Sequence, residues 1–118
     1  MNNELINKMV TTAYNALDEK KAEDIKIINV GEQSVIADYF VIASGTNQSQ
    51  INALVDSVGE KLSKEGFHAK SVEGSQNSTW ILMDYGDIIV HIFSREDREF
   101  YDLERIWADC KTLSLDEL

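Results

Sequence analysis

Two apolar runs joined by the dipeptide Tyr85-Gly86 constrain the fold more than any other feature of this sequence. Residues 79–84 and 87–93 are rich in β-branched and aromatic side chains, which is typical of strands. A two-residue loop that contains Gly favours a tight hairpin, because Gly readily adopts the positive φ that such turns require. The sequence therefore predicts two neighbouring antiparallel strands over residues 79–93.

The predicted hairpin register divides its side chains between two faces. With Tyr85-Gly86 as the loop, Asp84 lies opposite Asp87, Leu82 opposite Ile89 and Trp80 opposite His91. One face is then wholly apolar and is expected to lie under helices. The other carries those six side chains, an unusual set for a surface left to solvent. We expect this second face to be covered, either by a bound protein or by a further helix.

Patterns elsewhere predict a single α/β domain over residues 1–118, with helices flanking a mixed sheet of about five strands in the order αββαβββα. Apolar side chains at three- and four-residue spacing predict the helices. The expected elements are helices over about residues 3–18, from Asn47 to Gly66 and from Ser94 onward, and strands over residues 25–30, 38–44, 68–73, 79–84 and 87–93. The last helix is expected to be continuous and to carry Phe100, Leu103, Ile106, Trp107 and Cys110 on one face.

The charge balance indicates what kind of partner the chain can have. It contains 21 acidic and 11 basic side chains, a formal net charge of −10. Binding of naked nucleic acid relies on Lys and Arg side chains that neutralise phosphates. We therefore predict no direct binding to naked nucleic acid, and a basic or neutral protein partner.

The single cysteine and the N-terminal sequence suggest a compartment. Cys110 cannot form an intramolecular disulfide, whereas small exported domains usually contain several. The sequence shows neither the pattern of a signal peptide nor an apolar run of membrane-spanning length. We expect a cytoplasmic protein that does not associate with membranes.

Residues with catalytic potential are present but do not form a recognisable active site. Neither common phosphate-binding glycine motif occurs, and His68 and His91 lack the spacing of a zinc site. Asp84 and Asp87 could together hold Mg²⁺, although Asp is also common in turns. We therefore predict no enzymatic activity, no catalytic residue, no metal site and no cofactor.

Several ordered segments carry a family resemblance. They are residues 37–46, Glu73-Gly74, Trp80, residues 84–93 and residues 100–107. In these segments, and over roughly residues 3–109, the chain resembles the ribosomal silencing factor family, also called Iojap-like. The family's tryptophan on its fourth strand matches Trp80, and its Asp-x-Gly-Asp turn matches residues 84–87.

The resemblance implies a small domain with a nucleotidyltransferase-like fold, without enzymatic activity and often homodimeric when free. It further implies docking on a basic protein of the large ribosomal subunit, the fourteenth in that set, at the surface where the small subunit joins. Such docking would sterically block subunit association and so repress translation in starvation or stationary phase. The expected protein-binding residues are Trp80, Leu82, Asp84, Tyr85, Asp87, Ile89, His91, Tyr39 and Asp38.

Two alternatives remain open from the residues themselves. The first is a degenerate or active nucleotidyltransferase-like enzyme that uses Mg²⁺ at Asp84 and Asp87. The second is a dimeric adaptor that buries Trp80 in its own homodimer. Both use the same hairpin, so each is tested at the same residues.

Overall fold

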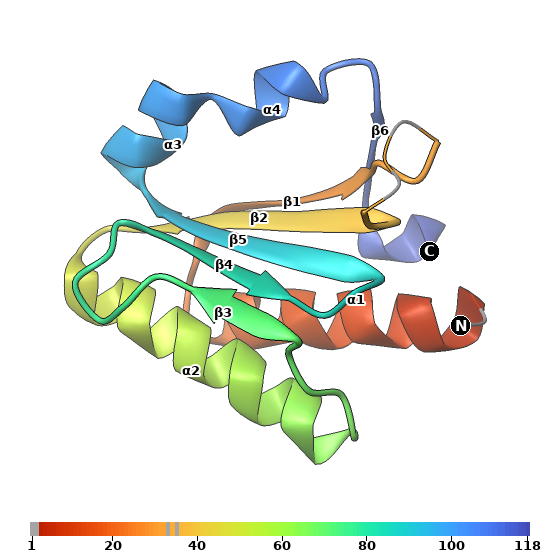
Figure 1. Ribbon diagram of the computed structural model, residues 1–118, viewed down its shortest axis with the longest axis horizontal. Helices are drawn as coiled ribbons and strands as arrows, with labels where there is room; N and C mark the ends of the chain where they lie inside the picture. The colour runs from red at the N-terminus through yellow and green to blue at the C-terminus, as the bar shows by residue number, and fades with distance from the viewer. Residues whose placement is uncertain (1–2, 33, 35) are drawn as a thin grey trace.

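The protein consists of a six-stranded mixed sheet with helices on both faces (Figure 1). The structure is a computed structural model and describes residues 3–32, 34 and 36–118. In chain order the elements are α1 (Asn3–Glu19), β1 (Glu23–Asn29), β2 (Tyr39–Gly45), α2 (Gln48–Lys64), β3 (Ser71–Glu73), β4 (Trp80–Asp84), β5 (Ile88–Ser94), α3 (Arg95–Tyr101), α4 (Leu103–Ile106), β6 (Lys111–Leu113) and a final 3-10 turn (Leu115–Glu117).

The strand order across the sheet is β3-β4-β5-β2-β1-β6. The pair β2–β5 is parallel, and every other neighbouring pair is antiparallel. The expected pairing of the strands near residues 25–30 and 38–44 is confirmed, with Ile28 opposite Phe40. The central strands β2 and β5 are almost completely buried, because helices lie on both sides of them.

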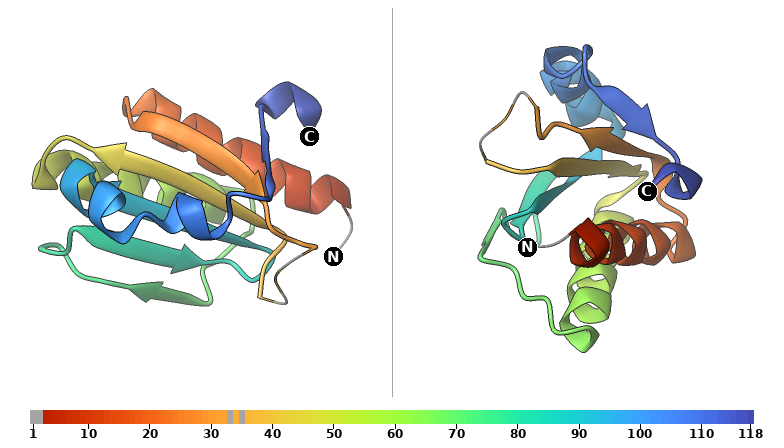
Figure 2. Two further views of the ribbon diagram at one scale, coloured as in Figure 1. Left: turned by 90° about the horizontal axis from the view of Figure 1, so that it is seen from above. Right: turned by 90° about the vertical axis from the view of Figure 1, so that its right-hand side faces the viewer.

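Two hydrophobic clusters lie on opposite faces of the sheet. Helices α1 and α2 cover one face, and α3 and α4 lie across the other (Figure 2). The larger cluster lies under α1 and α2 and includes Val10, Leu17, Ile27, Leu54 and Ile92. The smaller cluster lies under α3 and α4 and includes Phe40, Ile42, Ile89 and Phe93, with Leu103 and Trp107 packed against it. The second face is therefore covered in part by the protein's own helices.

The start of α2 is confirmed at the predicted position. Asn47 has an extended backbone, and its side-chain oxygen accepts a hydrogen bond from the backbone N–H of Gln50 at 2.8 Å. The side-chain oxygen of Gln50 accepts a hydrogen bond from the N–H of Thr46 at 2.7 Å, and its amide donates to the carbonyl of Lys21 at 2.9 Å. This small network joins the loop after α1 to the start of α2.

The predicted hairpin register is wrong by two residues. The two-residue loop is Gly86-Asp87, because the N–H of Tyr85 donates to the carbonyl of Ile88 at 2.9 Å. Gly86 has a φ of +88°, and its N–H donates to the Asp84 carboxylate at 2.7 Å. Asp87 therefore lies in the loop and not on a strand face.

The correct register pairs Trp80 with Phe93, Leu82 with His91 and Asp84 with Ile89. Side chains alternate between the two faces of a strand, so a slip of two residues changes the partners without changing the faces. The predicted division of the hairpin into two faces is consequently retained.

The predicted continuous C-terminal helix is also wrong. Asp102 adopts a left-handed conformation (φ 46°, ψ 49°), which separates α3 from α4. Phe100 and Ile106 are therefore 80% and 68% exposed instead of sharing a buried stripe. The chain then returns along β1 as β6, so the sheet has six strands and not about five.

Candidate protein-binding surface

Trp80 lies at the start of β4 on the sheet face that α3 and α4 cover in part. Its indole stacks on Phe93, with ring centroids 4.9 Å apart and an interplanar angle of 25°. Tyr101, at the end of α3, lies against it with centroids 4.8 Å apart. Trp80 is half-buried, so one part of the indole is held by the protein and another part faces solvent.

His91 supports Trp80 from the neighbouring strand. The indole Nε1–H of Trp80 donates a hydrogen bond to Nδ1 of His91 at 3.2 Å. Nδ1 therefore acts as an acceptor, which places the imidazole proton on Nε2. Nε2 is buried and has no hydrogen-bond partner in the described part of the chain. Burial lowers the pKa of His91 from 6.5 to about 4, so the ring is neutral at physiological pH.

Five of the expected binding residues lie together on this face, but to different depths. Trp80, Leu82 and Asp84 are partly accessible along β4. Ile89 and His91, on the neighbouring strand β5, are only 5% and 3% exposed. The accessible residues among these five therefore all lie on β4. We call Trp80, Leu82 and Asp84 the Trp80 surface.

The structure places the other expected residues elsewhere. Tyr39 and Tyr85 pack against the larger cluster, on the face covered by α1 and α2. Tyr85 is 6% exposed, and burial raises the pKa of its hydroxyl. Asp38 and Asp87 lie at one end of the sheet, where the N–H of Asp38 donates to the carbonyl of Asp87 at 2.8 Å. The incorrect hairpin register placed Asp87 on the face of Trp80, and no register was predicted from which to place Asp38 and Tyr39.

A shallow groove of about 220 Å³ lies beside Trp80, lined by Glu73, Gly74, Trp80 and Leu82. Glu73 pairs in register with Leu82 across the β3–β4 ladder, so it is on the same face as Trp80. Sequence reasoning noted Glu73-Gly74 as part of a motif but did not place Glu73 at the site. The short length of β3 left its register undefined in the sequence.

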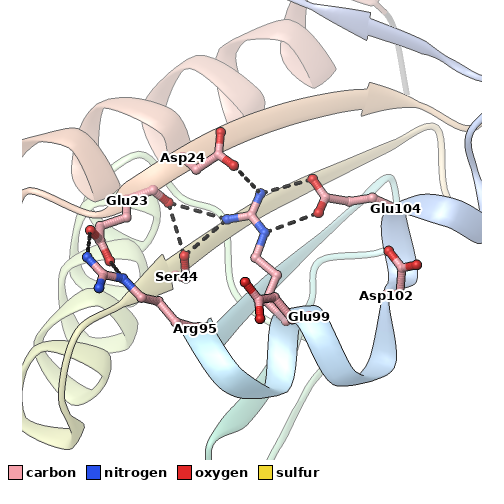
Figure 3. A pocket seen from close by; sticks show the side chains of 8 residues that line it. Glu23, Asp24, Ser44, Arg95, Glu99, Asp102 and Glu104 are labelled. Atoms are coloured by element: carbon pink, nitrogen blue, oxygen red, sulfur yellow. Dashed lines mark hydrogen bonds and ion pairs between the residues drawn. The ribbon is translucent and has the colours of Figure 1, made fainter.

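A buried ion-pair cluster fixes α3 and α4 on the same face (Figure 3). The Arg98 guanidinium, whose side chain is 9% exposed, contacts both carboxylate oxygens of Glu104 at 3.0 and 3.2 Å. It also donates to the Ser44 hydroxyl at 3.2 Å and to the Glu23 carbonyl at 3.3 Å. Hydrogen bonding from Arg98 lowers the pKa of Glu104. Sequence reasoning did not identify this cluster, because its members are far apart along the chain.

The cluster borders a hollow of about 310 Å³ that also contains Asp24, Arg95, Glu99 and Asp102. Arg95 forms an ion pair with Glu23, and Lys26 forms one with Glu104 at 3.3 Å. Around the guanidinium lie Glu23 and Asp24 of β1, Ser44 of β2 and Glu104 of α4, whereas Asp102 stands apart between α3 and α4 (Figure 3). Arg98 itself is therefore compensated by Glu104 and Asp24, whereas Glu99 and Asp102 form no ion pair within the described residues.

No metal-binding arrangement is evident: across residues 3–32, 34 and 36–118, no group of three or more His, Cys, Asp or Glu side chains is placed to hold an ion. Asp84 instead accepts a hydrogen bond from the turn it flanks. The same residues contain no helix long and apolar enough to cross a bilayer.

Comparison with known proteins identifies the family. Residues 3–118 match the family model described as "Ribosomal silencing factor during starvation". The chain belongs to the ribosomal silencing factor family. A curated ribosomal silencing factor from Halalkalibacterium halodurans is 35% identical over 109 residues, which cover 92% of this chain and 93% of that protein.

Two crystal structures share the fold of this silencing factor. A Chromobacterium violaceum protein is 31% identical, with a TM-score of 0.84 over 87% of this chain and 86% of that chain. A Bacillus halodurans protein is 33% identical, with a TM-score of 0.79 over 96% of this chain and 99% of that chain. The expected α/β class and family resemblance are therefore confirmed. Silencing factors act without enzymatic activity, and membership implies binding to the large ribosomal subunit.

Proposed function

We propose that this silencing factor docks its Trp80 surface on a basic protein of the large ribosomal subunit, at the face where the small subunit joins. The bound factor then occupies space that the small subunit needs, and translation is repressed in starvation or stationary phase. The observation that carries the proposal is the half-exposed, internally supported indole of Trp80.

The contacts that hold Trp80 in place favour a role as the anchor of a protein interface. Tryptophan is frequent among the residues that contribute most to protein binding. The hydrogen bond to His91 and the stack on Phe93 hold the indole in one orientation before binding. A side chain that is already ordered loses less conformational entropy when its partner arrives.

Unpaired carboxylates near the hairpin suit a basic partner. Within the described residues, Asp38, Asp84 and Asp87 form no ion pair with Lys or Arg. Together with the net charge of −10, these side chains favour approach of a positively charged surface. The same charge disfavours contact with the phosphates of naked RNA.

The contact area in this proposal is narrower than the set of residues expected from the sequence. Ile89 and His91 are buried on the neighbouring strand β5, where His91 accepts the hydrogen bond from the Trp80 indole. Tyr39 and Tyr85 support the hairpin from the opposite face. The cytoplasmic location and the homodimer expected from the sequence remain predictions.

A subunit-joining experiment tests the proposal. Purified large and small subunits are mixed with the parent protein or with Trp80→Ala, and joined particles are quantified by sedimentation. The parent should reduce the joined fraction, and Trp80→Ala should lose most of this effect. Removing a buried interface tryptophan costs about 2–4 kcal/mol, or roughly 30- to 1000-fold in affinity.

The control is Ile106→Ala, which removes an exposed apolar side chain of α4 outside the Trp80 surface. A folded Trp80→Ala protein that blocks joining as well as the parent would show that the surface is wrongly assigned. A parent protein that leaves the joined fraction unchanged would contradict the blocking function itself.

A further inference from the structure

The groove beside Trp80 is built by a close approach of the chain after β3. Gly74 has a φ of +113°, and a Cβ at this position would lie 3.0 Å from Cγ1 of Ile81 and 3.2 Å from the Trp80 carbonyl. Glycine is therefore required for the chain to turn so near β4. This turn places Glu73 at the edge of the groove. Leu82 and Trp80 form the apolar wall of the groove.

Glu73 supplies a free carboxylate at this groove. Its side chain is exposed and makes no hydrogen bond or ion pair with any residue of the described chain. On the side of α3, Glu104 is paired with Arg98 and Lys26, and Glu23 with Arg95, whereas Glu99 and Asp102 border the hollow around Arg98 (Figure 3). The free carboxylate that lines the same groove as Trp80 and Leu82 is therefore that of Glu73.

We propose that this groove receives one basic side chain, arginine or lysine, of the large-subunit protein to which the factor docks. The aliphatic stem of that side chain packs against Leu82 and the accessible part of the Trp80 indole, and its cationic head pairs with the Glu73 carboxylate. Arginine and lysine both combine an apolar stem with a charged head, which matches an apolar wall ending in a carboxylate. This inference rests on the proposed function and adds the chemistry of one contact.

Binding to purified large subunits tests the inference with variants of Glu73. Glu73→Gln keeps the shape of the side chain and removes its charge, whereas Glu73→Lys reverses the charge. The matched control is Asp18→Lys, an equal change of charge at an exposed position of α1, on the opposite layer. Glu73 is exposed on an edge strand and Asp18 is exposed on α1. All three variants should therefore unfold at temperatures close to that of the parent.

We expect Glu73→Gln to weaken binding about tenfold and Glu73→Lys about 100-fold, because a contact pair at an interface is lost or made repulsive. Asp18→Lys should change affinity less than about threefold, since it alters the overall charge alone. The affinity of Glu73→Gln should also depend less steeply on salt than that of the parent.

The outcomes separate this inference from the proposed function. If the parent binds, Trp80→Ala does not, and both Glu73 variants bind like the parent, the groove assignment is wrong while docking through Trp80 stands. Equal losses for Glu73→Lys and Asp18→Lys would also overturn it, because they would indicate general electrostatic steering. If the parent itself does not bind large subunits, the proposed function is contradicted, and the groove assignment that rests on it is contradicted as well.

Discussion

Trp80 donates its indole N–H to Nδ1 of His91, which lies two residues away from Phe93, the direct cross-strand partner of Trp80. This diagonal contact links the half-exposed residue of the proposed anchor to an almost fully buried one. It requires neutral His91 with its proton on Nε2. Protonation of His91 would replace the acceptor by a second donor facing the indole N–H.

Stability should depend on pH through His91. Burial lowers its pKa from 6.5 to about 4, and its ring neighbours are Phe40, Trp80 and Phe93, none of them charged. The unfolded chain therefore binds this proton more readily, so the free energy of unfolding should fall as the pH falls from 6.5 to about 4. The total loss should be about 3 kcal/mol, levelling off below pH 4.

Urea unfolding at a series of pH values measures this loss, with His91→Phe as the comparison. His91→Phe should remove most of the dependence between pH 6.5 and 4.5. The Glu104 carboxylate has a lowered pKa, so its contribution is lost as the pH falls below 4.5 and should remain in the variant. An unchanged slope above pH 4.5 in His91→Phe would contradict the assignment.

The two neighbouring arginines of α3 should differ in their effect on stability. Arg98→Met leaves Glu104 and the Ser44 hydroxyl without a buried donor, and should lower the free energy of unfolding by about 2–3 kcal/mol. Arg95→Met removes an ion pair with Glu23 that is exposed to solvent, and should have little effect. Chemical unfolding of both variants provides the measurement. Equal losses would show that burial of Arg98 is not what makes its contacts important.

The break between α3 and α4 should tolerate glycine but not a β-branched residue. Asp102 has a φ of +46°, a conformation that disfavours Val because of its branched Cβ. Asp102→Val should lower stability by about 1–2 kcal/mol, whereas Asp102→Gly should remain within about 0.5 kcal/mol of the parent. Asp109→Val is the control, because Asp109 is exposed and lacks a positive φ. Similar stabilities for Asp102→Val and Asp102→Gly would argue against the left-handed break.

The free protein is expected to be a homodimer that does not depend on Trp80. Large apolar side chains remain exposed elsewhere, including Val72, Phe100 and Ile106, and can supply area for self-association. Light scattering should therefore give the mass of a dimer for both the parent and Trp80→Ala. Loss of the dimer in Trp80→Ala alone would favour the adaptor that buries Trp80 between its own subunits. A monomeric parent would contradict the dimer prediction.

Local periodicity was sufficient to predict helices α1 and α2. The helix expected over residues 3–18 is Asn3–Glu19, and Asn47 caps α2 as expected. The two faces of the β4–β5 hairpin also follow from the alternation of side chains along a strand. The assignment of residues to these faces was correct although the predicted register was wrong by two residues. Such features depend on neighbours a few residues apart, so one sequence contains the information for them.

By itself, then, the sequence determined the succession of helices and strands up to about residue 100, but not the break at Asp102 or strand β6. It also determined that Trp80 shares a face with Leu82, Asp84 and His91. The tertiary structure decided how much of that face stays open. Arg98 on α3 bonds to Ser44 on β2, 54 positions earlier, and this contact helps to hold α3 and Tyr101 beside Trp80. Burial of a sheet face depends on elements that return from distant parts of the chain, and their contacts leave no local periodic signal.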